Sequence, residues 1–224
     1  MTDASHSQAT QPGEARPGEG DNTVEAAAAV SRYFSPELGR TMVSIPPGGC
    51  YVSADPDEVL TTVLGSCVSA CIRDVDAGVG GLNHFLLPDT GGTDSSDRGY
   101  RYGSYAMEAL INMILSRGGA KNRLEIKLFG GAEVLSDVRP IGRRNVAFAE
   151  NFLATERMAV ATRHLGGKRA RRIQYFPTTG RVRLRVLPGD QQKTVVAEEK
   201  AFTRYLRRTD VEGDIELFNE KPSK

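Results

Sequence analysis

A cysteine and a histidine stand in two short apolar segments that a turn-like segment separates. Cys67 follows the dipeptide Gly65-Ser66, and His84 lies seventeen residues further along the chain. A thiolate is a strong nucleophile, and it needs a base such as histidine to form it and later to protonate the leaving group. The pair therefore points to thiol-dependent hydrolysis.

The spacing of the two residues suggests how they could meet. Their midpoint falls between Val75 and Asp76, within the turn-like residues 74–78. If the flanking segments pair as an antiparallel hairpin about this midpoint, Cys67 and His84 lie directly opposite each other, with Cβ atoms about 4.5–5.5 Å apart. A longer turn would shift that register. The spacing thus predicts a thiol and an imidazole within hydrogen-bonding reach.

The other cysteines and histidines fit a catalytic pair less well. His6 lies in a polar N-terminal segment, and His164 has no cysteine close to it in the sequence. Cys50 begins a short predicted strand. Cys71 shares a strand face with Cys67, and its apolar neighbours favour a small packed core residue. Cys67 and His84 remain as the predicted nucleophile and base.

Residues beside the pair could complete a site. The backbone N–H groups of Ser66 and Cys67 follow a glycine and could stabilise an oxyanion. Asn83 is a poor candidate for orienting His84, because neighbours on a strand point to opposite faces. The hydroxyl or carbonyl of Thr61 could accept the histidine Nδ1–H, although Thr61 could equally be a strand residue without a catalytic part.

Three other interpretations of these residues stay open. The cysteines and the histidine could be buried core residues of a hairpin, because free cysteine is commonly buried. Cys67, Cys71 and His84 could supply three zinc ligands, but a second close pair is absent. A redox sensor would need a resolving cysteine, for which Cys71 is the nearby candidate.

Composition excludes several classes of protein. The 224 residues include 29 basic and 28 acidic side chains, so the net charge of +1 gives no bulk signal for nucleic acid or an anionic membrane. No apolar run approaches the roughly 20 residues that span a bilayer, and the N-terminus has no signal-peptide pattern. Three cysteines make no disulfide framework. We expect a reduced, cytoplasmic setting.

Hydrophobic periodicity and turn residues divide the chain into three parts. Residues 1–39 are predicted to be a disordered or partly helical tail, with the alanine-rich residues 24–30 as the helical portion. Residues 40–190 form the predicted globular domain. Residues 191–224 are a charged extension, with a short helix at 197–207 and a strand at 214–218, that docks on the body. Further predicted helices are 105–117 and 141–155; further strands are 41–45, 50–52, 124–129, 158–162, 172–176 and 181–186.

Two other patterns are specific enough to interpret. Gly130-Gly131 follows a predicted strand and suits a backbone that passes close to a neighbouring loop or the active site, but the Lys-Ser/Thr of a phosphate loop is missing. The strand at 181–186 alternates apolar residues with three arginines. That arginine face is either a solvated sheet surface or a docking surface for an acidic partner.

Several motifs in order resemble the CheD family of chemoreceptor glutamine deamidases. The resemblance covers roughly residues 42–186, and its motifs are LGSCV at 64–68, GLNHFLLP at 81–88, RYG at 101–103, AME at 106–108, KLFGGA at 127–132, IGRRN at 141–145 and LGG at 165–167. It implies an α/β layered sandwich, similar to the deamidase core of cytotoxic necrotising factors. It also implies a Cys-His-Thr triad at Cys67, His84 and Thr61, with Thr62 as the alternative if the register is off by one.

The resemblance also implies an activity and partners. Cys67 would attack the side-chain amide of a glutamine on a chemoreceptor's cytoplasmic helix, pass through a thioester and release ammonia, leaving glutamate. The implied mechanism requires no metal or cofactor. The implied partners are methyl-accepting chemoreceptors, with a CheC-type phosphatase as a second candidate. Two other functions stay open: a CheD-like adaptor with little catalysis, and a related thiol hydrolase such as a peptidase or ester hydrolase.

Overall fold

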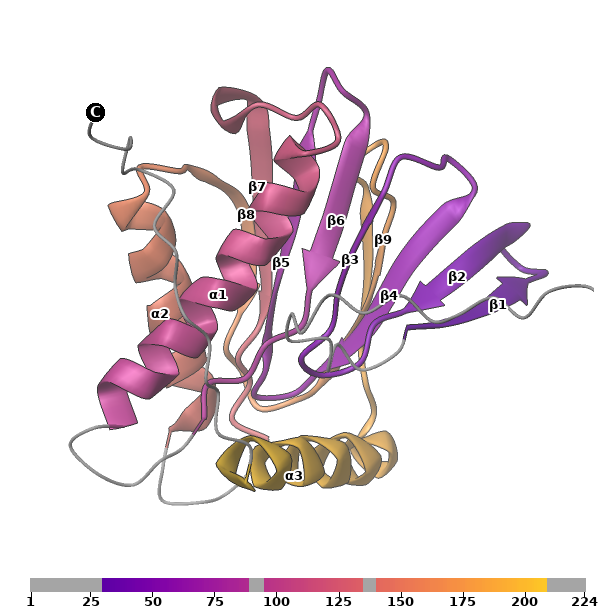
Figure 1. Ribbon diagram of the computed structural model, residues 1–224. Coiled ribbons are helices and arrows are strands. Elements are labelled where there is room, and N and C mark those ends of the chain that lie inside the picture. Colours follow the sequence, from indigo (N-terminus) through magenta and orange to yellow (C-terminus); the bar gives the residue numbers. More distant parts are fainter. Residues whose placement is uncertain (1–29, 89–94, 135–139, 209–224) are drawn as a thin grey trace, which may run out of the picture.

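Two five-stranded sheets packed face to face form the centre of the molecule (Figure 1). The structure is a computed structural model that describes residues 30–88, 95–134 and 140–208. Helices α1 and α2 cover the outer face of one sheet, and α3 lies across one end of the sandwich. The predicted α/β layered sandwich is confirmed.

The first sheet has the strand order β1-β2-β4-β9-β10. Its strands are β1 (Ser31–Ser35), β2 (Arg40–Ser44), β4 (Glu58–Leu64), β9 (Arg171–Tyr175) and β10 (Val182–Val186). Strands β2 and β4 are parallel, and the other neighbours are antiparallel. The even-numbered residues of β4 face the second sheet, since Leu60 and Leu64 belong to the core between the sheets.

The second sheet has the strand order β3-β6-β5-β7-β8. Its strands are β3 (Cys50–Ser53), β6 (Val79–Asn83), β5 (Val68–Asp74), β7 (Leu124–Gly130) and β8 (Val160–Leu165). Only the β7–β8 pair is parallel, and α2 (Ile141–Thr155) forms its crossover. Strands β2 and β3 lie in different sheets, so the intervening turn at residues 46–49 carries the chain from one sheet to the other.

The two largest hydrophobic clusters of the described residues hold the layers together. Between the sheets lie Val43, Ile45, Leu60, Leu64, Cys67, Cys71, Leu82, Leu86, Phe129, Ile173 and Tyr175. The second core joins the outer face of the second sheet to α1 (Ser95–Leu115) and α2. The apolar stripe predicted for α1 is buried there, at Met107, Leu110, Ile111 and Ile114. The predicted core helix is therefore confirmed.

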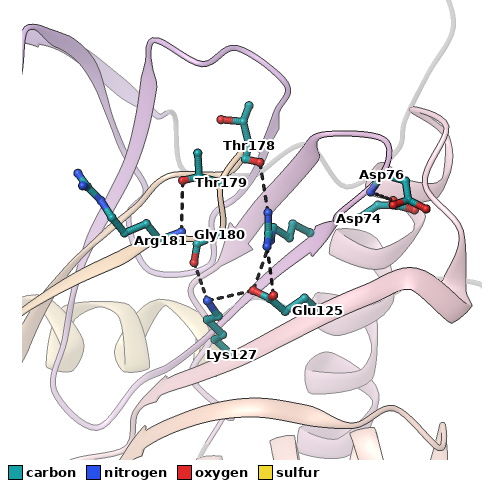
Figure 2. Close-up of polar contacts among 9 residues, drawn as sticks. Asp74, Asp76, Glu125, Lys127, Thr178, Thr179, Gly180 and Arg181 are labelled. Atoms are coloured by element: carbon teal, nitrogen blue, oxygen red, sulfur yellow. Dashed lines mark hydrogen bonds and ion pairs between the residues drawn. The ribbon is translucent and has the colours of Figure 1, made fainter.

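A polar cluster ties the two sheets together at the end away from α3 (Figure 2). Lys127 Nζ on β7 donates to Gly180 O in the β9–β10 turn at 2.7 Å and pairs with Glu125 at 2.9 Å. Arg73 on β5 pairs with Glu125 at 3.2 Å and donates to Thr178 O at 3.3 Å. The β9–β10 hairpin is thereby fixed to the strands that carry the nucleophile segment.

The predicted element boundaries need three corrections. The tail predicted to end at residue 39 contains β1, which pairs with β2 over its whole length. Helix α1 begins at Ser95, ten residues before the predicted start. Gly103 in this added part approaches Phe148 so closely that a Cβ would lie 2.5 Å from its ring, so close packing explains why a glycine, a poor helix former, stands within the helix. The C-terminal helix α3 (Gln192–Arg208) begins five residues before the predicted 197.

Two predictions fall on residues that the structure does not cover. The predicted strand at 214–218 lies outside the described residues, and so does nearly all of the predicted helix at 24–30. The two short 3₁₀ helices at Lys121–Arg123 and Gly189–Gln191 were not predicted. The second of them links β10 to α3, and it therefore sets where α3 can lie.

Candidate active site

The nucleophile loop, residues 65–67, joins β4 of one sheet to β5 of the other. Each of its three carbonyl groups accepts a hydrogen bond of 2.7 Å from outside the loop: Gly65 from Ala132 N–H, Ser66 from the Asn145 side-chain amide, and Cys67 from Gly131 N–H. Because the three carbonyl groups are hydrogen-bonded on one side of the loop, the three N–H groups point together to the other side. Such a run of backbone N–H groups forms an anion-binding concavity.

The anion in that concavity is the side chain of Glu199 from α3. Its carboxylate accepts hydrogen bonds of 3.0 Å from the N–H groups of Gly65, Ser66 and Cys67, and one of 2.6 Å from the Ser66 hydroxyl. The N–H groups predicted as oxyanion donors thus bind a negatively charged oxygen in this structure. The role of Glu199 was not foreseen from the sequence.

Gly130 holds β7 against the nucleophile loop. Its φ of 111° lies in a region that other residues rarely adopt, and a Cβ there would lie 2.1 Å from the Cys67 carbonyl oxygen. The close backbone approach expected of Gly130-Gly131 is therefore an approach to Cys67 itself. A glycine is required at residue 130 for the loop to take its present shape.

His84 is oriented by Thr62. The Thr62 hydroxyl lies 2.7 Å from the Ile45 carbonyl oxygen and 2.7 Å from His84 Nδ1. Because the hydroxyl donates its proton to the carbonyl, Nδ1 carries a proton and donates to the hydroxyl. This assignment of the tautomer leaves Nε2 as the free lone pair, and Nε2 is buried with no hydrogen-bond partner in the structure. A free Nε2 is what a general base needs.

The environments of His84 and Cys67 favour their uncharged forms. Burial lowers the pKa of His84 below its usual 6.5, although the neighbouring Glu199 carboxylate opposes that shift. Burial and the same carboxylate raise the pKa of the Cys67 thiol well above its usual range. In the state described, the pair is therefore a neutral imidazole and a protonated thiol.

Cys67 and His84 share a face but do not lie directly opposite each other. Val68 pairs with Phe85, and Cys71 pairs with Leu82. This register is shifted by two residues from the predicted one, because four residues, 75–78, form the turn. A shift of two preserves the face, so the two residues are diagonal neighbours, with Cα atoms roughly 7–8 Å apart.

Thr61 does not lie beside His84, and the prediction is corrected to Thr62. The Thr61 hydroxyl donates to the Ile173 carbonyl at 2.8 Å, and its own carbonyl accepts from Ile45 N–H at 2.9 Å. The physical reason is strand alternation: Thr62 points from β4 toward the second sheet and His84, while Thr61 points away. The alternative register derived from the family resemblance is the one that fits.

We expect Thr62→Val to lower the rate of thiol-dependent hydrolysis at this site by about 10- to 100-fold. Thr61→Val is the matched control. The estimate follows from losing one hydrogen bond to a residue that becomes charged, worth about 1.5–3 kcal/mol. Steady-state kinetics of both variants, with thermal unfolding to check folding, would measure it. A larger loss of turnover in Thr61→Val would argue against Thr62 as the orienting residue.

Asn83 and Asn145 are structural in different ways. Asn83 points away from the site, as predicted: its Oδ1 accepts from Ala70 N–H at 2.9 Å and its Nδ2 donates to Ala106 O at 2.8 Å. Asn145 on α2 is fully buried; it donates to Ser66 O and accepts from Leu87 N–H at 3.0 Å. Asn145 therefore positions the nucleophile loop, a role that its motif alone did not reveal.

The remaining candidates occupy structural positions. Cys71 is buried in the core between the sheets, and burial raises the pKa of its thiol. Cys50 packs against Met113, and burial raises its thiol pKa to about 12. His164 contacts Arg171 through Nδ1 at 2.8 Å. His6 lies outside the described residues.

An open groove of about 630 Å³ reaches His84. Its lining also includes Thr61 and Thr62 of β4, and Phe202 and Tyr205 of α3. In the part of the chain that the structure covers, no group of three or more His, Cys, Asp or Glu side chains is placed to hold a metal ion. Nor is any helix there long and apolar enough to cross a membrane.

A buried thiol, an oriented imidazole and an anion-binding loop define a cysteine–histidine site in an α/β sandwich. Comparison with known proteins gives the family. The model of the family described as "CheD chemotactic sensory transduction" matches residues 86–186. Two curated proteins named "Probable chemoreceptor glutamine deamidase CheD" are similar over most of their length. That of Rhodopseudomonas palustris is 47% identical, over 88% of this chain and 93% of the relative. That of Halorhodospira halophila is 44% identical, over 84% and 90%.

The chain belongs to the CheD family. A solved structure, the Neisseria meningitidis protein NMB0706, is 12% identical over 53% of this chain and 51% of its own, with a TM-score of 0.32.

Proposed function

We propose that this protein is a cytoplasmic chemoreceptor glutamine deamidase in which Cys67 is the nucleophile. The single observation that carries this proposal is the geometry of the nucleophile loop, whose three N–H groups converge on a carboxylate oxygen pair beside the Cys67 thiol. A carboxamide has nearly the shape of that carboxylate. The names of the family's curated members support the choice of substrate.

The geometry supports a two-step hydrolysis. His84 Nε2 takes the Cys67 proton, and the thiolate attacks the side-chain carbonyl carbon of the substrate glutamine. The N–H groups of the loop stabilise the negative oxygen. The protonated His84 then gives its proton to the amide nitrogen, which leaves as ammonia, and a thioester remains. A water molecule that His84 deprotonates attacks the thioester, which yields glutamate and restores the thiol.

The test is mass spectrometry of a chemoreceptor cytoplasmic fragment that carries glutamines. Incubation with the wild-type protein should raise the mass of specific peptides by about one unit each, because replacing an amide NH₂ by OH adds about that much. Cys67→Ala should abolish the change, since the reaction depends on that sulfur. Cys71→Ala is the matched control, a second buried cysteine that should keep the activity if it folds.

A second candidate function is an adaptor that binds chemoreceptors with little catalysis. The observation that favours it is the complete burial of Cys67, whose exposed fraction is 0%. Binding of the receptor fragment without any mass change would support the adaptor. Cleavage of the backbone or of an ester, instead of release of ammonia, would indicate a different thiol hydrolase.

A further inference from the structure

Helix α3 binds the body through one apolar face with a single acid at its centre. Val195, Phe202 and Leu206 contact the body or are buried, and Glu199 lies between them on the same helical stripe. Glutamate is almost never fully buried unless it is paired, yet Glu199 is only 2% exposed. This residue therefore needs a specific explanation.

The partners of Glu199 identify the position that it occupies. The hydrogen bonds to its carboxylate described above come from Gly65, Ser66 and Cys67, the loop that would hold the oxyanion during hydrolysis. The helix lies directly across the end of the sandwich where this loop is found (Figure 1). Glu199 thus fills the position where the side chain of a substrate would react.

The presence of Glu199 is incompatible with turnover in the state described. The carboxylate takes up every N–H donor of the nucleophile loop, and the Cys67 thiol beneath it is completely buried. The packing of Phe202 closes the site further, because a Cβ on Gly48 in the turn between β2 and β3 would lie 2.7 Å from its ring. A substrate can reach the thiol only after α3 has moved.

We propose that α3 is a built-in inhibitory helix that occupies the substrate site, with Glu199 in the place of the target side chain. This inference rests on the proposed deamidase function, of which a glutamate on a helix would be the product. It also describes the substrate class: a glutamine on an amphipathic helix, with apolar side chains four residues before and three and seven residues after it. The protein is active when such a helix, or another ligand, displaces α3.

The first test measures access to the thiol without using the enzymatic reaction. The full-length protein is treated with iodoacetamide, and alkylation of Cys67 is followed by peptide mass spectrometry. We expect Glu199→Ala to react at least about tenfold faster than the wild type, because both the cover and the carboxylate that disfavours the thiolate are removed. Glu198→Ala is the matched control, an exposed acid one residue away that makes no bond to the loop. Equal rates in wild type and Glu199→Ala would overturn the proposal.

The second test uses the isosteric variant Glu199→Gln, which retains the shape of the helix face. If α3 occupies the substrate site, Cys67 should attack the new glutamine, release ammonia and hydrolyse the thioester, so the protein converts its own residue 199 back to glutamate. The mass of that peptide should rise by about one unit with time, and the double variant with Cys67→Ala should stay unchanged. Persistence of the new glutamine in a protein that deamidates a receptor fragment would overturn the assigned place of Glu199.

The two tests separate the failure of this inference from that of the proposed function. If Glu199→Ala exposes Cys67 but neither residue 199 of the glutamine variant nor a receptor fragment is deamidated, the inhibitory cover is supported and the deamidase function fails. If a receptor fragment is deamidated while alkylation is the same with and without Glu199, the function is supported and the inhibitory helix is rejected. Circular dichroism of each variant confirms that the body is folded.

Discussion

His84→Ala is expected to lower the rate of deamidation by about 10²–10⁴-fold, the usual contribution of a positioned general acid–base. The imidazole acts twice in the proposed reaction, as the base that forms the thiolate and as the acid that protonates departing ammonia. Thr62 fixes its tautomer, and among the residues that the structure describes Nε2 has no other partner that would compete for the proton. Single-turnover kinetics on a receptor fragment would measure the loss.

The same variant has an expected effect on stability that a structural histidine near the surface would not show. Because burial lowers the pKa of His84 in the folded state, the unfolded chain binds more protons than the folded one between that lowered value and about 6.5. The free energy of unfolding should therefore fall as the pH falls through this window. His84→Ala should remove this part of the pH dependence, as measured by urea unfolding between pH 4 and pH 7. A variant that retains full turnover would exclude His84 as the base.

Gly130→Ala is expected to lower the free energy of unfolding by about 3 kcal/mol or more, or to prevent folding. The added Cβ would lie 2.1 Å from the Cys67 carbonyl oxygen, at a φ of 111°. Strained backbone conformations cost about 1–3 kcal/mol by themselves, and the contact with backbone cannot be relieved by turning a side chain. Equilibrium unfolding in urea would measure the change.

Gly39→Ala is the control for Gly130→Ala. Gly39 also has a positive φ, 61°, but a Cβ there meets nothing within 4 Å. It should therefore show only the conformational cost of about 1–2 kcal/mol. If the free energy of unfolding falls by the same amount in both variants, the close approach of β7 to the nucleophile loop contributes nothing to stability. If a larger loss in Gly130→Ala comes with loss of turnover in the folded fraction, β7 shapes the loop as well as supporting it.

Local patterns in the sequence predicted most of the part of the site that flanks β5 and β6. The apolar segments, the turn between them and the shared face of Cys67 and His84 all follow from short-range alternation. The register could not be predicted, because it depends on how the turn closes: Asp74 Oδ1 accepts from the N–H groups of Asp76 and Ala77 at 2.9 Å and stabilises a four-residue turn. Whether Thr61 or Thr62 orients His84 likewise depends on which face of β4 meets the second sheet.

Contacts between distant parts of the chain could not be derived from the sequence in the same way. Asn145 lies 79 residues from the Ser66 carbonyl that it binds, and Glu199 lies 132 residues from the Cys67 N–H. A signal for Glu199 was nevertheless present, since an acid within an otherwise apolar helical stripe is unusual. The C-terminal extension was predicted to dock on the body. The structure adds that its helix α3 covers the nucleophile loop.

The short link between β10 and α3 has a consequence for how the protein would respond to its surroundings. Residues 187–191 connect Val186 to the first residue of α3, so Glu199 is presented to the site at a local concentration of about millimolar, whatever the concentration of the protein. Dilution would not relieve the inhibition. A free target helix at low abundance would compete poorly, whereas many target helices gathered in one place would compete well. The activity of the protein would then depend on the local concentration of target helices as well as on their amino-acid sequence.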